Sequence, residues 1–126
     1  MYSSSSANQR FGNKTVTYSY SLNTDYVVKT SKSGLIVNNT NYTRTTTTAF
    51  STEGNLYLMS CNTGSSNGAV GKLYYAKIWD GEVLVRDFVP VRVAQVGYLY
   101  DRVTDRVFAN AGTGDFVLGN DISTTA

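Results

Sequence analysis

The sequence has no histidine and only one cysteine, Cys61. Without histidine, the chain lacks the commonest metal ligand and the commonest general base of enzymes. A single cysteine excludes a disulfide within the chain. Cys61 ends the apolar run 56–61, where nothing nearby would supply a base, so we interpret it as a small buried hydrophobic residue rather than a reactive thiol. We therefore expect a protein that is not an enzyme.

Long hydrophobic runs and a strong charge of one sign are missing too. No run approaches the ~18 apolar residues of a membrane span, and residues 1–10 are polar and serine-rich, unlike a secretion signal. The 11 basic and 9 acidic residues are scattered and give a net charge of +2. We therefore expect neither membrane insertion nor nucleic-acid binding, and any export signal would have to lie upstream or be absent.

The 126 residues do contain short segments in which apolar and polar residues alternate. Residues 15–21 place Val16, Tyr18 and Tyr20 on one face of a strand, with Thr and Ser on the other. Further strands are predicted at 26–30, 35–37 and 56–61, with turns at 32–34 and 38–41. Residues 42–52 are threonine-rich, which predicts a polar edge strand, with a disordered tract as the alternative. The length fits a single domain, residues 1–126.

From residue 69 onward the sequence has fewer hydroxyl residues and more valine. Strands are predicted at 71–79 and 83–93 around a tight turn at 80–82, then a hairpin joining 98–100 to 107–108, and a last strand at 115–119. Pro90 lacks an N–H donor and therefore indicates an edge position or a bulge. No helical periodicity is present, so the fold class predicted is an antiparallel β-sandwich or jelly roll.

Asp87 interrupts the valine face of the strand 83–93. An inward carboxylate must be paired or hydrogen-bonded. A basic residue on another strand, such as Arg102 or Lys72, would make a structural bridge, and the alternative is a ligand or calcium contact. Calcium needs about six to eight oxygen ligands, and no dense Asp/Asn loop supplies them, so no cofactor is expected and Ca²⁺ has little support.

Three segments of the second half share a pattern with a known family. They are KIWDGEVLVRDFVPVR at 77–92, GYLYD at 97–101 and FANAGTGDFVLG at 108–119. In this order and spacing they resemble the end of concanavalin A-like (laminin-G-like) lectin-type jelly rolls, as found in phage tail or fibre proteins and bacterial surface proteins. Residues 68–119 carry most of the resemblance.

The resemblance implies a jelly roll that begins after the family's first strands. A neighbouring chain or another part of a longer protein would supply those strands, or the fold is a reduced version. Since a cut sheet exposes an edge that proteins normally pair or cover, we expect other protein chains to complete it in an oligomer. The resemblance also implies a virion or an extracellular, cell-surface location.

Acidic residues give little support to hydrolysis. Glycoside hydrolases need two carboxylates on one face at a fixed separation, and no strand here carries such a pair. Asp80 and Glu82 flank a turn glycine and are interpreted as solvated turn residues. Asp101 and Asp105 flank another turn, where surface ion pairing or turn capping is the simpler interpretation.

Exposed aromatic planes flanked by amides would suit carbohydrate, because sugar C–H faces pack on rings while hydroxyls take hydrogen bonds. The candidate ligand-binding residues are Trp79, Tyr42, Asn62 and Asn67, with core packing as the alternative for each ring. The first functional hypothesis is a non-catalytic module that binds surface glycans in adhesion. The second is a structural module that decorates or assembles a virion or filament.

Overall fold

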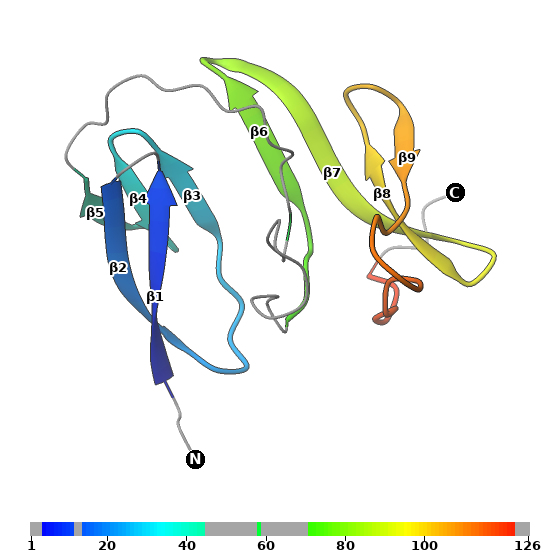
Figure 1. Ribbon diagram of the computed structural model, residues 1–126, viewed down its shortest axis with the longest axis horizontal. Helices are drawn as coiled ribbons and strands as arrows, with labels where there is room; N and C mark the ends of the chain where they lie inside the picture. Colours follow the sequence, from blue (N-terminus) through cyan, green and yellow to red (C-terminus); the bar gives the residue numbers. More distant parts are fainter. Residues whose placement is uncertain (1–3, 12–13, 45–57, 59–70, 123–126) are drawn as a thin grey trace. The chain divides into compact units, whose positions relative to one another are not determined.

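The computed structural model describes residues 4–11, 14–44, 58 and 71–122. Within these residues every regular element is a strand, every strand pair is antiparallel, and no helix capable of crossing a membrane is present, which confirms the all-β antiparallel class. The chain divides into two compact units, Met1–Gly54 (unit 1) and Asn55–Ala126 (unit 2), shown in blue to cyan and in green to red in Figure 1. A single domain over residues 1–126 stays a prediction.

Unit 1 begins with a long hairpin. Strands β1 (Ser4–Phe11) and β2 (Lys14–Ser21) pair over their whole length, from Ser4 opposite Ser21 to Phe11 opposite Lys14. The strand predicted at 15–21 is therefore confirmed, including its alternation: Val16 is buried, while Thr15 and Thr17 are exposed. β1 was not predicted, because its polar, serine-rich sequence has no apolar alternation.

A three-stranded meander follows the hairpin. It consists of β3 (Val28–Ser31), β4 (Gly34–Val37) and β5 (Thr40–Thr43). The turn between β4 and β5 is narrower than the 38–41 predicted: Asn38 and Asn39 alone form it, with φ of 50° and 83°. Asparagine tolerates this left-handed backbone better than other non-glycine residues, so the pair suits a two-residue hairpin turn.

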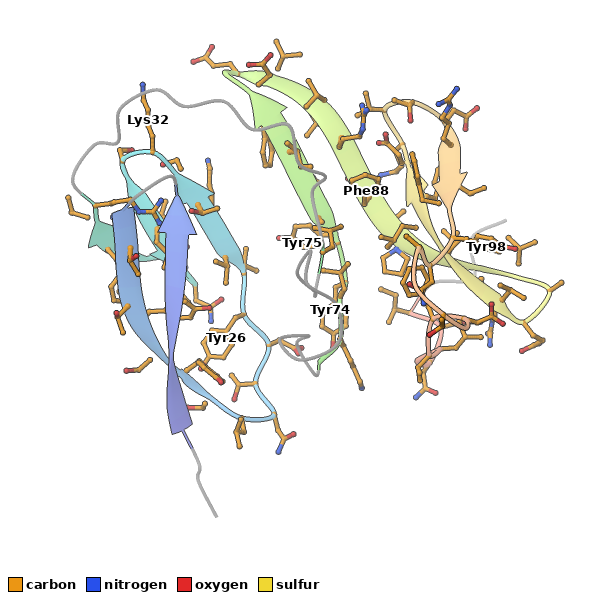
Figure 2. The ribbon with its side chains drawn as sticks, in the orientation of Figure 1. Tyr26, Lys32, Tyr74, Tyr75, Phe88 and Tyr98 are labelled. Atoms are coloured by element: carbon orange, nitrogen blue, oxygen red, sulfur yellow. The ribbon has the colours of Figure 1, made fainter. Side chains whose placement is uncertain are left out.

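The core of unit 1 lies between its two sheets. Val16 from β2 meets Leu35 and Val37 from β4, and these three residues are 8%, 1% and 5% exposed. Three half-buried tyrosines pack against them: Tyr18, Tyr26 (labelled in Figure 2) and Tyr42. Since β1 lies beside β3 and β2 beside β5, unit 1 is a small two-layer β-sandwich.

Unit 2 is a four-stranded meander in the order β6 (Ala76–Asp80), β7 (Val83–Val93), β8 (Val96–Asp101) and β9 (Arg106–Phe108) (Figure 1). Its strands match the predicted positions, although β6 starts later than residue 71. The turn after β6 contains Gly81 with φ of 61°, a conformation that glycine adopts at little cost. The register between β6 and β7 shifts at Ile78/Trp79, as at a β-bulge.

Pro90 occupies the kind of position predicted for it. β6 pairs with β7 only as far as Phe88, so beyond this point the described strands pair with β7 on one side alone. Pro90 lies in that stretch, opposite Leu99 of β8. A residue without an N–H is tolerated there because the ladder on its other side has already ended.

The strand predicted at 115–119 is wrong, because these residues have no strand assignment and pair with none of the described strands. Their alternation nevertheless has a physical meaning. Phe116 and Leu118 pack over the buried Gly97 of β8: a Cβ atom at Gly97 would lie 2.9 Å from the Leu118 side chain and 3.2 Å from Phe116 Cβ, whereas Val117 between them is 98% exposed. An ion pair between Arg92 and Asp121 also holds this segment. The apolar pattern therefore reports packing on a sheet face rather than strand pairing.

Some predictions fall outside the described residues. One is the part of the predicted 42–52 edge strand that lies beyond Arg44. The other is the predicted strand at 56–61 with the loop after it, of which only Leu58 is described. Arg44 itself is buried and donates hydrogen bonds to the Ser31 carbonyl (2.8 Å) and to Thr30 Oγ1 (3.4 Å), so it links the end of β5 to β3.

Candidate functional site

The register of the unit 2 sheet sorts its side chains onto two faces, because residues directly opposite each other, and those two apart along a strand, share a face. We call one the tryptophan face; its residues are Lys77, Trp79, Asp87, Val89, Val91, Val93, Val96, Tyr98, Tyr100 and Val107. Trp79 is placed on it by alternation with Lys77 along β6, because the register shift at Ile78/Trp79 interrupts the pairing with β7 there. The opposite, phenylalanine face is the one on which Phe88 and Phe108 meet edge to face, 5.7 Å apart. The C-terminal segment at Gly97 lies on this second face.

An exposed row of side chains begins just before β6 and continues along it on the tryptophan face. It consists of Tyr75, Lys77 and Trp79, and Figure 2 shows Tyr75 at the start of the strand. Tyr75 and Trp79 are each 47% exposed. The Lys77 ammonium lies 5.8 Å from the centre of the Tyr75 ring, within cation–π range, which places both side chains on the same side of the backbone. We call these three residues the β6 row.

The nearest charges beside the β6 row are already paired with each other. Asp87 lies directly opposite Lys77, but its carboxylate accepts hydrogen bonds from Arg102 Nε (3.0 Å) and Nη2 (3.2 Å). This is the bridge predicted for Asp87, and Arg102 rather than Lys72 provides it. Arg102 also extends the backbone hydrogen bonding between β7 and β8, since its N–H donates to the Asp87 carbonyl at 2.9 Å. The bridge fixes the turn after β8 against β7.

Asp101 is fully buried, with 0% of its surface exposed. Its Oδ1 accepts the N–H groups of Asp87 (2.9 Å) and Val103 (3.1 Å), and its Oδ2 accepts the Thr104 hydroxyl (2.7 Å) and lies 3.6 Å from Arg86 Nε. Desolvation by burial acts to raise the pKa of Asp101, but these hydrogen bonds and the charge of Arg86 outweigh it, so the pKa lies below the ordinary 3.8.

The predicted roles of the acidic turn residues are therefore corrected in part. Asp101 does cap its turn, yet it is an interior carboxylate and not a surface one, because burying it satisfies three donors at once. Asp105 accepts the Tyr100 hydroxyl at 2.5 Å, and this hydrogen bond raises the pKa of Tyr100 above 10.0. Asp80 and Glu82 are exposed on either side of Gly81. Asp101 and Asp87 thus hold the sheet and its last turn together.

The predicted ligand-binding residues do not all come together. Trp79 lies in the β6 row. Tyr42 belongs to unit 1, where it packs against the core and its ring lies 6.4 Å from that of Tyr18, so the structure gives it the packing role that was its alternative. Asn62 and Asn67 lie outside the described residues.

Two members of the β6 row, Tyr75 and Lys77, were not predicted. The signal was present in the sequence, because Tyr75, Lys77 and Trp79 are spaced by two in a predicted strand and must share a face. Nothing in the sequence showed that this face would stay exposed at β6. In the part of the chain that the structure describes, no three His, Cys, Asp or Glu side chains lie close enough to hold a metal ion.

Comparisons of the chain with family models, curated proteins and solved structures found no significant match.

Proposed function

We propose that the protein is a non-catalytic glycan-binding or adhesion module, with the β6 row as its contact surface, in a phage fibre or tail or on a bacterial cell surface. The β6 row supports this most directly: it has two half-exposed aromatic rings, one just before β6 and one within it, and a cation over the first ring. The family resemblance of residues 68–119 supports a concanavalin A-like jelly roll as the setting, completed by strands from elsewhere.

The geometry favours a chain of sugars over a single sugar. Tyr75 and Trp79 are four residues apart in extended backbone, so their attachment points are separated by about 13 Å. A ligand that touches both rings is therefore longer than one pyranose ring. The rings offer apolar planes for sugar C–H groups, and each ring is only about half exposed, so each contact is weak. Several copies acting together would raise the avidity.

Replacing Trp79 with alanine is expected to weaken glycan binding about tenfold, because one aromatic stacking plane is lost. The measurement is a glycan array probed with the biotinylated chain on streptavidin, which supplies multivalency. Val83→Ala is the matched control: Val83 is 65% exposed and lies opposite Asp80, at the same turn but outside the β6 row. Glycan binding that is equal in Trp79→Ala and wild type would rule out the β6 row, and a silent array would rule out the function.

A second function, assembly into a virion or filament, is favoured by a different observation. The tryptophan face exposes apolar side chains on several strands, including Val93 and Val107, each 57% exposed. Apolar side chains gathered on one exposed face commonly mark contacts between proteins. In this proposal other chains cover the face and complete the sheet.

This second function predicts self-association or association with a partner chain. Light scattering after size exclusion should give a mass above the 13.8 kDa of one chain, increasing with concentration. Val107→Lys should reduce that mass, because it places a charge in the contact, while Val28→Lys on unit 1, at a residue 45% exposed, should not. A monodisperse monomer over the whole concentration range would contradict the assembly proposal.

A further inference from the structure

We infer that the β6 row selects anionic glycans, whose sugars carry a carboxylate or a sulfate group; this rests on the glycan-binding function proposed above. The determinant is Lys77, which lies between Tyr75 and Trp79 in the sequence and holds its ammonium over the Tyr75 ring. An ammonium group beside a stacked sugar ring can meet an acidic substituent of that ring without displacing either aromatic contact.

Lys77 keeps its charge available to a ligand. The carboxylate directly opposite it, Asp87, is held by two hydrogen bonds from Arg102. Among the described residues Lys77 forms no ion pair, and its ammonium lies over the Tyr75 ring, 5.8 Å from the ring centre. A cation over a ring retains most of its attraction for an anion, because the ring carries no net charge.

Three other acidic groups of the sheet are not directed at Lys77. Asp80 follows Trp79 in β6 and, by alternation, belongs to the opposite face. Asp105 accepts the Tyr100 hydroxyl, and Asp101 is buried inside its own set of donors. The chain as a whole is nearly neutral, with a net charge of +2, and Lys77 is the cation that the β6 row itself offers to a ligand.

The test compares glycan pairs that differ only in charge. Suitable probes are oligogalacturonate and its methyl ester, sialyllactose and its methyl ester, and a sulfated and a desulfated keratan tetrasaccharide, so that the three pairs distinguish uronate, sialate and sulfate. Wild type is expected to bind the anionic member of at least one pair about three- to tenfold more tightly, as one partly exposed charge-assisted contact allows. This preference should shrink as the salt concentration rises.

Lys77→Gln should reduce the preference of the anionic over the neutral member to about onefold, because it removes the charge of the β6 row. Lys32→Gln is the control, since it removes the same charge from the turn between β3 and β4 of unit 1 (Figure 2). Equal binding of both members by wild type, or a preference that survives Lys77→Gln, would overturn the anionic selectivity and leave glycan binding standing. Failure to bind either member of any pair would overturn the proposed function as well.

Discussion

Replacing Asp101 with alanine is expected to lower the melting temperature of the chain by on the order of 10 °C or more, a larger effect than we expect from any other single polar substitution. The side chain is 0% exposed and accepts hydrogen bonds from the Asp87 and Val103 N–H groups and from the Thr104 hydroxyl. Alanine leaves those donors buried without an acceptor, which costs more than the hydrogen bonds themselves contribute. Circular dichroism during heating measures the effect.

Two further variants make the result specific to the carboxylate. Asp101→Asn keeps the shape and the acceptor for the two N–H groups, so its melting temperature should lie between those of wild type and Asp101→Ala. Asp80→Ala removes an exposed carboxylate at the end of β6 and should change the melting temperature by only a few degrees, as usual for a surface site. Equal effects of Asp80→Ala and Asp101→Ala would contradict the buried network.

The pH dependence of stability gives a second readout of the same carboxylate. The pKa of Asp101 is lower in the folded chain than the ordinary 3.8, so the unfolded chain binds this proton first as the pH falls. Its stabilisation is complete above about pH 4 and is lost as the pH falls through the lower pKa of the folded state. The free energy of unfolding of wild type should therefore fall more steeply at acid pH than that of Asp101→Asn. The same acid dependence in both proteins would contradict a lowered pKa of Asp101.

Leu35→Ala is expected to destabilise the chain by about 2–5 kcal/mol, the range for emptying a well-packed aliphatic site. Leu35 is 1% exposed and belongs to a core with only two other buried hydrophobic residues among those that the structure describes, Val16 and Val37. A core this small has few other side chains to close the cavity, and the loss is a large part of the ~5–15 kcal/mol that stabilises a typical domain. Urea denaturation followed by circular dichroism measures it.

Ile36→Ala is the matched control for Leu35→Ala. The two residues are neighbours in β4 and lose a similar side chain, but Ile36 points to the other face and is 38% exposed. We expect about 1 kcal/mol or less from this change. If Ile36→Ala cost as much as Leu35→Ala, the sandwich core of unit 1 would be assigned to the wrong face of β4.

The alternation of side chains along strands explains which features could be predicted from the sequence. In β2 the spacing of Val16, Tyr18 and Tyr20 fixed both the strand and its inner face, because side chains on a strand alternate with a period of two. The same period placed Asp87 on the valine face of β7, and the cost of an unpaired carboxylate then required a cation from a neighbouring strand. Arg102 supplies it.

The features that were missed depend on tertiary contacts that the local sequence does not specify. β1 is polar, and its strand conformation comes from pairing along the whole of β2. Residues 115–119 have a strand-like pattern but pack over Gly97, a residue whose missing side chain makes room for them. Burial of Asp101 depends on three donors that the β8 turn and β7 bring together. In the candidate site, Trp79 was predictable as an aromatic residue at a turn, whereas the exposure of Tyr75 beside it was not.

The proposed contact through the β6 row can be tested directly because Trp79 is the only tryptophan in the chain, so its fluorescence reports on this row alone. The strongest glycan from the array would be titrated into the wild-type protein and into Tyr75→Ala. We expect a saturable change in Trp79 emission in wild type, with about tenfold weaker apparent affinity in Tyr75→Ala. A glycan whose binding is detected by calorimetry but leaves the emission of Trp79 unchanged would contradict the proposed contact.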